Sequence, residues 1–299
     1  MTLPIQETVI VYPLIVPVES AGFPPVSPFG EHAAQRHLIE DPLRVAGVRD
    51  YQLGDDPRRI HWKATAHAGT LRSKIYEYST MRRMLVLLDT RNYSHSWMGV
   101  DLELQELTIS ATASIAVWAL DEGYMVGLLA NSGIMVEPGS DDEVLFTETP
   151  ADDEDAPVET YHLSSPGVNV PFALDEGQYE RLLSMLARLV PRHTIPVEDI
   201  IEMEQRMFQP GTTVVLVSSA TAVSEETAGQ LLNMRKRGIA VHLALTDTFE
   251  DARAIEAYGL PVHYIGGREQ WYQLIEAAKD EKSSTIGIDS IHSIAFRLD

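Results

Sequence analysis

One acidic residue stands where a parallel sheet would present it to a ligand. Asp89 ends the apolar run Met84–Asp89, which has the form of a short, buried parallel strand. Ligands of parallel sheets bind outside the carboxyl ends of the strands, so a carboxylate there can hold a cation. Arg91 follows two positions later and can pair bidentately with Asp89, taking the electrostatic place of a metal ion. Alternatively, Asp89 is a plain strand-end cap or salt-bridge partner.

The common motifs of catalytic sites are missing from the sequence. A phosphatase of the haloacid dehalogenase kind needs a second acid at position 91, which is arginine. There is no G-x-S-x-G nucleophile elbow and no G-x-x-x-x-G-K-[ST] phosphate-binding loop. The ten histidines are scattered, with His32 and His37 five apart and no H-E-x-x-H, and cysteine is absent. We therefore expect no enzymatic activity and no cofactor.

The densest group of candidate recognition residues is the segment Gly47–Lys63, GVRDYQLGDDPRRIHWK. Its glycines suit turns, and an acid before Pro57 suits the N-cap of a short helix. Several interpretations stay open, a catalytic role of the segment among them. The side chains either hold the N-terminal part on the sheet through Arg–Asp pairs, or form an exposed basic surface that recognises a partner or a phosphorylated ligand. The candidate binding residues are Arg49, Asp55, Arg58, His61, Trp62 and Lys63.

The charge is distributed unevenly along the chain. The 44 acidic and 23 basic residues give a formal charge of -21, yet Arg44 to Arg91 holds ten Lys or Arg and five Asp or Glu. Between Arg91 and Arg181 there are eighteen Asp or Glu and no Lys or Arg. A chain this acidic repels phosphate backbones, so we expect no nucleic acid among its partners.

Strands and helices alternate from Arg83 onward, which is typical of a parallel sheet covered on both faces. We expect strands at 84–89, 124–130, 213–219, 239–245 and 261–266, and helices at 102–120, 178–190, 197–208, 225–237, 249–258 and 269–278. A short strand at 134–137 is expected to form a hairpin with 124–130. Upstream, 72–80 has β character, and 9–15 is either an edge strand or an extended arm.

The stretch from about 138 to 176 has no regular period and is rich in acids. We interpret it as a long acidic loop inserted into the domain. Its acids at 141–143 and 152–155 could bind Ca²⁺ weakly or dock on a basic partner, but they lack EF-hand spacing, and a solvated loop is the favoured interpretation.

The Gly47–Lys63 segment resembles the signature of the family called domain of unknown function 58, with ten positions of fixed type in seventeen. The strand ending at Asp89 and the strand in GTTVVLVSS also resemble this family, over roughly residues 9–275. Its members are similar to von Willebrand factor A domains, are often encoded beside MoxR-type AAA+ ATPases, and many carry membrane-spanning helices. The resemblance implies a protein partner such as a MoxR-type AAA+ ATPase. It also implies a full-length protein that can be membrane-anchored, although no anchor is seen in this chain.

The resemblance also implies that the sheet edge at Asp89 lacks part of a metal site that related domains carry. In von Willebrand factor A domains this edge holds a metal-ion-dependent adhesion site, built from Asp-x-Ser-x-Ser, a threonine and a further acid after the fourth strand. Here Asp89 matches, but Arg91 and Tyr93 replace the serines, and Ser218–Ala220 offers no acid. We expect a degenerate site without metal. A divalent-metal-dependent adhesive or hydrolytic site around Asp89 is the alternative.

We therefore predict an α/β fold with a three-layer, mostly parallel doubly wound sheet of the von Willebrand factor A kind over residues 81–278. A small N-terminal β-rich extension, 1–80, and a C-terminal tail, 279–299, complete the expected organisation. No apolar run reaches the ~18 residues that a membrane span needs. The expected function is a non-enzymatic protein-binding adaptor or scaffold, in the cytoplasm or on the cytoplasmic face of the membrane.

Overall fold

The chain folds as two compact units. The computed structural model describes residues 10–17, 39–52, 56–79, 82–93, 101–148 and 159–284. The smaller unit lies within 35–81, and the larger unit comprises the rest. Among the described residues, no helix is both long and apolar enough to cross a bilayer.

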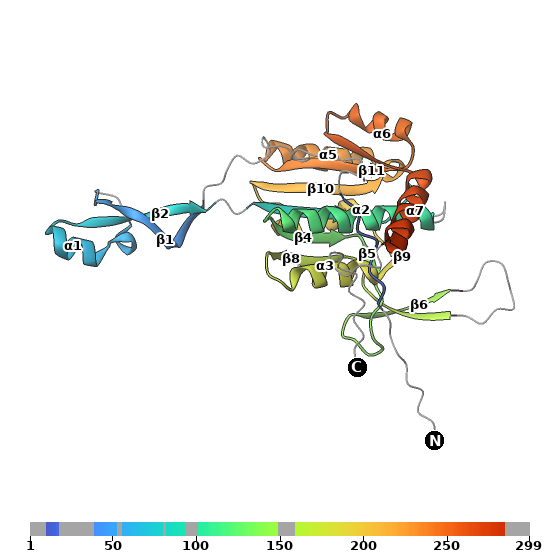
Figure 1. Ribbon diagram of the computed structural model, residues 1–299, viewed down its shortest axis with the longest axis horizontal. Coiled ribbons are helices and arrows are strands. Elements are labelled where there is room, and N and C mark those ends of the chain that lie inside the picture. Colours follow the sequence, from blue (N-terminus) through green and yellow to red (C-terminus); the bar gives the residue numbers. More distant parts are fainter. Residues whose placement is uncertain are drawn as a thin grey trace, which may run out of the picture. The chain divides into compact units, whose positions relative to one another are not determined.

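The larger unit is built on a six-stranded sheet of order β12-β11-β10-β3-β4-β8 (Figure 1). The strands are β3 (Arg83–Leu88), β4 (Met125–Ala130), β8 (Val168–Ala173), β10 (Thr212–Ser219), β11 (Ala240–Thr246) and β12 (Val262–Gly266). All neighbours are parallel except β8, which runs antiparallel to β4. Numbered along the chain the order is 3-2-1-4-5-6, which reverses direction between β3 and β10. A doubly wound sheet binds ligands at this switch point.

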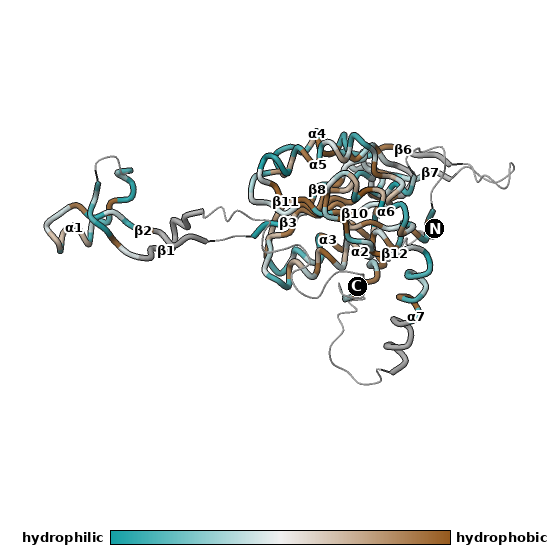
Figure 2. Tube along the Cα trace, turned by 90° about the horizontal axis from the view of Figure 1, so that it is seen from above, coloured by the Kyte–Doolittle hydropathy of each residue, from teal (hydrophilic) through white to brown (hydrophobic). Residues whose placement is uncertain are grey.

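Helices cover both faces of the sheet and give the unit three layers (Figure 2). One face carries α2 (Leu102–Asp121), α3 (Gln178–Ala187) and α7 (Arg268–Ser284), and the other carries α4 (Val197–Met203), α5 (Glu225–Lys236) and α6 (Phe249–Glu256). Side chains of β3 alternate between the two cores: Val86 faces the α2 side and Leu87 the α4 side. The predicted three-layer, mostly parallel fold class is confirmed by this arrangement.

Helix α2 is buried on most of its surface, as its composition predicted. Three of its hydroxyls are satisfied within the helix: those of Thr108, Thr112 and Ser114 donate to the carbonyls four residues earlier, at 2.7–2.9 Å. Ser114 Oγ also accepts the backbone N–H of Val16 at 3.0 Å. Residues 10–17 contain no strand and lie in the larger unit as an extended arm, the second of the two forms expected for 9–15.

Two expectations about the segment after β4 are wrong. The strand β5 (Ser132–Ile134) pairs with β9 (Leu189–Thr194) rather than with β4, because both edges of β4 are already taken by β3 and β8. The stretch 138–176 is not an irregular loop, since it contains β6 (Glu143–Glu148), β7 (Glu159–Ser164) and β8. Strands β6 and β7 pair with each other, while β8 completes the main sheet. The acids at 152–155 lie outside the described residues.

The smaller unit is a hairpin with two short helices. Strand β1 (Ile39–Asp50) pairs antiparallel with β2 (Arg72–Ser79). Between them lie the 3₁₀ helix η1 (Pro57–Arg59) and α1 (Trp62–Ala68). Helix α1 ends at Gly69, whose φ of +69° is a left-handed C-cap that favours glycine. The Gly47–Lys63 segment therefore leads from the end of β1 through η1 into α1.

Two further 3₁₀ turns, η3 (Gln205–Met207) and η4 (Ala220–Ala222), belong to the larger unit.

Candidate functional site

The switch point of the sheet holds a buried ionic cluster, which we call the Asp89 cluster: Asp89, Thr90, Arg91, Asn131 and Glu198. Asp89 directly follows β3 and is 1% exposed. Arg91 folds back onto it, with Nε donating to Oδ1 at 3.0 Å and Nη2 donating to Oδ2 at 2.9 Å. The backbone N–H of Arg91 donates to Oδ1 as well, at 3.1 Å. The pairing that the sequence suggested is thus present as a bidentate contact.

Asn131, the first residue after β4, closes the other side of the carboxylate. Its Nδ2 donates to Asp89 Oδ1 at 2.6 Å and to the Ile195 carbonyl at 2.9 Å. Its Oδ1 accepts from the Thr90 backbone N–H at 2.9 Å and from the Thr90 hydroxyl at 3.0 Å. Both oxygens of Asp89 therefore have strong donors, and a cation could reach them only by displacing Arg91.

A second carboxylate approaches Arg91 from α4. Glu198 Oε2 lies 3.5 Å from Arg91 Nη2, and Oε1 accepts hydrogen bonds from the hydroxyls of Ser224, at 2.5 Å, and Thr227. Burial by itself raises the pKa of Glu198. The hydroxyl and backbone hydrogen bonds and the charge of Arg91 outweigh it, so its pKa lies below the ordinary value. Glu198 is therefore ionised at neutral pH, and the cluster holds one cation between two buried carboxylates.

The hydrogen bonds of the cluster hold its charged groups in fixed positions. Both oxygens of Asp89 and Oε1 of Glu198 accept hydrogen bonds, whereas Oε2 of Glu198 accepts none from a described residue and contacts Arg91 only as an ion pair at 3.5 Å. Among the described residues, no three His, Asp or Glu side chains lie close enough together to hold a metal ion. Tyr93, the second residue that replaces a serine, lines a pocket farther along the same edge.

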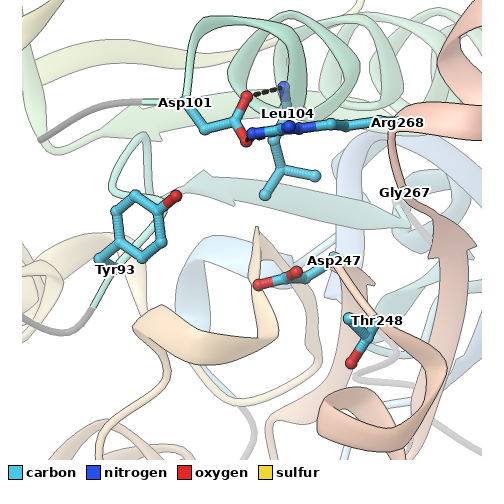
Figure 3. Close-up of a pocket in the computed structure, with 7 residues that line it drawn as sticks. All are labelled: Tyr93, Asp101, Leu104, Asp247, Thr248, Gly267 and Arg268. Atoms are coloured by element: carbon cyan, nitrogen blue, oxygen red, sulfur yellow. Dashed lines mark hydrogen bonds and ion pairs between the residues drawn. The ribbon is translucent and has the colours of Figure 1, made fainter. Parts of the chain in front are cut away.

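Asp247 is a further edge residue that sequence reasoning missed. It directly follows β11, and its Oδ2 accepts from Ser219 Oγ at 3.0 Å and from Thr221 Oγ1 at 2.9 Å. It is the one non-glycine residue with a positive φ, +99°, in the described part of the chain. Figure 3 shows its carboxylate pointing into the pocket that Tyr93 lines. Its position two residues after the end of the predicted strand 239–245 is the signal that could have found it.

In the smaller unit, part of the predicted segment is structural. Asp56 accepts the backbone N–H of Arg58 at 2.9 Å and caps η1, with Pro57 at its first position, as expected. His61 caps α1, because its Nδ1 accepts the backbone N–H of Ala64 at 3.1 Å. Asp55 lies outside the described residues.

Three other side chains of this segment face solvent. Arg58 and Lys63 are exposed, and Trp62 is 69% exposed, so it does not anchor the unit's interior. Arg49 lies in β1, where its Nη1 donates to the Asp50 carbonyl at 3.1 Å. The structure therefore exposes Arg58 in η1 and the neighbouring Trp62 and Lys63 at the start of α1.

One family model matches part of the chain. Residues 47–141 match the model described as "Protein of unknown function DUF58". The match includes the Gly47–Lys63 segment and, from the Asp89 cluster, Asp89, Arg91 and Asn131. The resemblance to this family is thereby confirmed over these residues, which are fewer than the roughly 9–275 expected.

The other comparisons add little. The crystal structure of the SpRpn10 VWA domain matches with 13% sequence identity and a TM-score of 0.34, covering 71% of this chain and 99% of that chain. A likeness this weak has no bearing on function. No curated protein matches the chain.

Proposed function

We propose that this protein is a non-enzymatic adaptor whose smaller unit binds an acidic surface of another protein through Arg58, Trp62 and Lys63, the Trp62 patch. The observation that carries the proposal is the 69% exposure of Trp62 between two exposed cations. Tryptophan and arginine are enriched among the residues that dominate binding energy at protein interfaces. A large aromatic side chain exposed to water at the first residue of α1 gains stability when a partner covers it.

The charge of the patch favours an acidic partner. Neither Arg58 nor Lys63 forms an ion pair with any residue that the structure describes. By contrast, Arg72 in the same unit is paired with Asp50 at 2.8 Å. In a chain of charge -21 this patch is a local excess of positive charge. Such an excess steers association with an acidic surface and opposes binding to a basic one.

The Asp89 cluster supports a scaffold rather than an enzyme. Its carboxylates are bound by Arg91, Asn131 and hydroxyl donors, so the position where a doubly wound sheet usually binds its ligand is filled by the protein's own side chains. Recognition of a partner protein then falls to exposed surfaces away from the switch point.

We further propose that the partner is a MoxR-type AAA+ ATPase and that the complex forms on the cytoplasmic side of the membrane. This part rests on the family resemblance, because such ATPases are often encoded beside members of the family. The first experiment is to crosslink and isolate the partner from the native cell. The second is to measure binding of the full chain to the purified ATPase.

The decisive variant is Trp62→Ala. Loss of a central hot-spot side chain removes about 2 kcal/mol or more, so the dissociation constant should rise by roughly 30-fold. Arg58→Ala with Lys63→Ala should lower the association rate and weaken its dependence on salt. Two matched controls should change binding less than about twofold: Leu71→Ala, which is 46% exposed in the same unit, and Lys236→Ala with Arg253→Ala, which removes two exposed charges elsewhere. If Trp62→Ala binds the ATPase as tightly as Leu71→Ala, the proposed site is wrong.

A further inference from the structure

A pocket of about 320 Å³ opens at the carboxyl edge of the sheet, beside the ends of β11 and β12. It is lined by Tyr93, Asp101, Leu104, Asp247, Thr248, Gly267 and Arg268 (Figure 3). Tyr93 follows β3, and Asp101 and Leu104 belong to the start of α2. Asp247 and Thr248 follow β11, Gly267 follows β12, and Arg268 begins α7. Elements far apart in the sequence thus converge on one concave site at the edge where such sheets bind ligands.

The backbone at Asp247 is held in a conformation that side chains rarely adopt. Its φ is +99°, its N–H donates to the Gly266 carbonyl at 3.1 Å, and its own carbonyl accepts from the Tyr264 hydroxyl at 3.1 Å. Gly267 is required there, because a Cβ on it would lie 2.8 Å from the Asp247 carbonyl oxygen. Strain that the surroundings fix in this way is concentrated at functional sites. In this case it aims the Asp247 carboxylate into the pocket (Figure 3).

Only one oxygen of the Asp247 carboxylate accepts hydrogen bonds from described residues. Oδ2 accepts from the hydroxyls of Ser219 and Thr221, whereas Oδ1 accepts no hydrogen bond from any described residue. No Lys, Arg or His of the described chain forms an ion pair with it. One oxygen of a fixed, half-buried carboxylate is therefore left for a donor from outside.

The remaining charges of the pocket cancel. Asp101 caps α2 by accepting the Leu104 N–H at 3.1 Å, and its other oxygen accepts from Arg268 Nε at 2.8 Å. Asp247 thus gives the pocket its single uncompensated charge, which is negative. Tyr93 stands on the opposite side, so that its aromatic ring and hydroxyl border the same space (Figure 3). A carboxylate facing an aromatic ring is a favourable setting for an organic cation.

We propose that this pocket binds a primary ammonium or guanidinium group, with Asp247 Oδ1 as its acceptor and Tyr93 as its aromatic wall. The volume suits a ligand the size of one lysine or arginine side chain, at the small end of ligand pockets. The net charge of -21 raises the local concentration of cations around the protein. The proposal does not depend on the Trp62 patch, which lies in the other unit.

The test is an NMR titration of the isotope-labelled full chain, following the amides of Asp247 and Gly267. The probes are n-butylammonium, n-butylguanidinium and the capped peptide acetyl-Gly-Lys-Gly-amide, with n-butanol as an uncharged control. We expect saturable shifts with the cations and none with the alcohol. Binding of the peptide as tightly as of n-butylammonium assigns the pocket to a side chain of a partner protein. Binding of the free amine alone assigns it to a small molecule.

Asp247→Asn is the decisive variant, because asparagine tolerates positive φ and keeps an oxygen for Ser219 and Thr221. It should weaken cation binding by about tenfold or more, the loss of one charge-assisted hydrogen bond. Tyr93→Leu should weaken it several-fold, whereas Asp199→Asn removes an exposed charge on α4 and should leave it nearly unchanged. The proposal is overturned if no cation saturates, if the alcohol shifts the same amides equally, or if Asp247→Asn binds like Asp199→Asn. If Asp247→Asn does not fold, Tyr93→Leu against Asp199→Asn decides by the same criterion.

Discussion

Replacing Arg91 by alanine should destabilise the larger unit more than any loss of a surface charge. The side chain of Arg91 is 17% exposed, and those of its partners Asp89 and Glu198 are 1% and 8% exposed. Arg91→Ala leaves two buried carboxylates facing the same vacated space without their shared cation. Removing one partner of a buried ion pair destabilises a protein by about 3–5 kcal/mol, because the remaining charge is left uncompensated.

This magnitude is large against the stability of a typical domain, about 5–15 kcal/mol. For a unit of this size, each kcal/mol shifts Tm by roughly 2–4 °C, so Tm should fall by about 6–20 °C. The matched control is Arg206→Ala. Arg206 contacts Glu204 at 3.3 Å but is 80% exposed, and an exposed pair contributes only about 0–1 kcal/mol.

Chemical denaturation and calorimetry of both variants provide the measurement. Asp89→Asn combined with Arg91→Met should be more stable than Arg91→Ala, since it removes one buried charge along with the arginine. Mg²⁺ or Ca²⁺ should raise the Tm of Arg91→Ala but not that of the unmodified protein, because two carboxylates then converge on an open position. An Arg91→Ala protein that loses no more stability than Arg206→Ala would refute the argument that the cluster is an electrostatic substitute for a metal.

Three other predictions follow from single contacts. Asn131→Ala should reduce the free energy of unfolding by about 2–4 kcal/mol, since buried donors and acceptors lose their partner; urea denaturation tests this. Gly266→Ala should destabilise by more than about 1 kcal/mol because φ is +125°, whereas Gly229→Ala, in α5 with open space around it, should stabilise slightly; parallel thermal melts compare their signs. Burial and the hydrogen bond to Asp121 raise the pKa of Tyr179 to about 12. The neutral phenol therefore stabilises the fold below pH ~10 and loses this effect as pH rises through about 12, so Tyr179→Phe should remove a step near pH 12 from a tyrosinate absorbance titration and flatten the loss of stability over that range.

The sequence correctly predicted those helices and strands whose burial produces a recognisable pattern of apolar residues. Strand β10 is buried at every residue and has the apolar run Val214–Val217 at its centre, and β3 is buried and apolar from Met84 to Leu88. Strand β8 was missed because its alternation is interrupted by Pro171. Proline is tolerated there because β8 is an edge strand, whose outer side has no ladder to donate to. Strand β1 was missed for a similar reason: Pro42 lies inside it, where its register against β2 shifts.

The residues of the candidate site divide clearly into those that the sequence could predict and those that it could not. Three polar residues of this edge each directly follow a parallel strand: Asp89 follows β3, Asn131 follows β4 and Asp247 follows β11. Once those strands are assigned, topology alone places all three at one edge, so testing every strand end, rather than the first and fourth, would have predicted this set. Glu198 carries no such signal, because it reaches Arg91 from the buried side of a short helix. The partner that turns a simple Asp–Arg pair into a cluster with two acids is therefore visible only in three dimensions, and its presence makes Arg91 a necessary charge rather than a replaceable one.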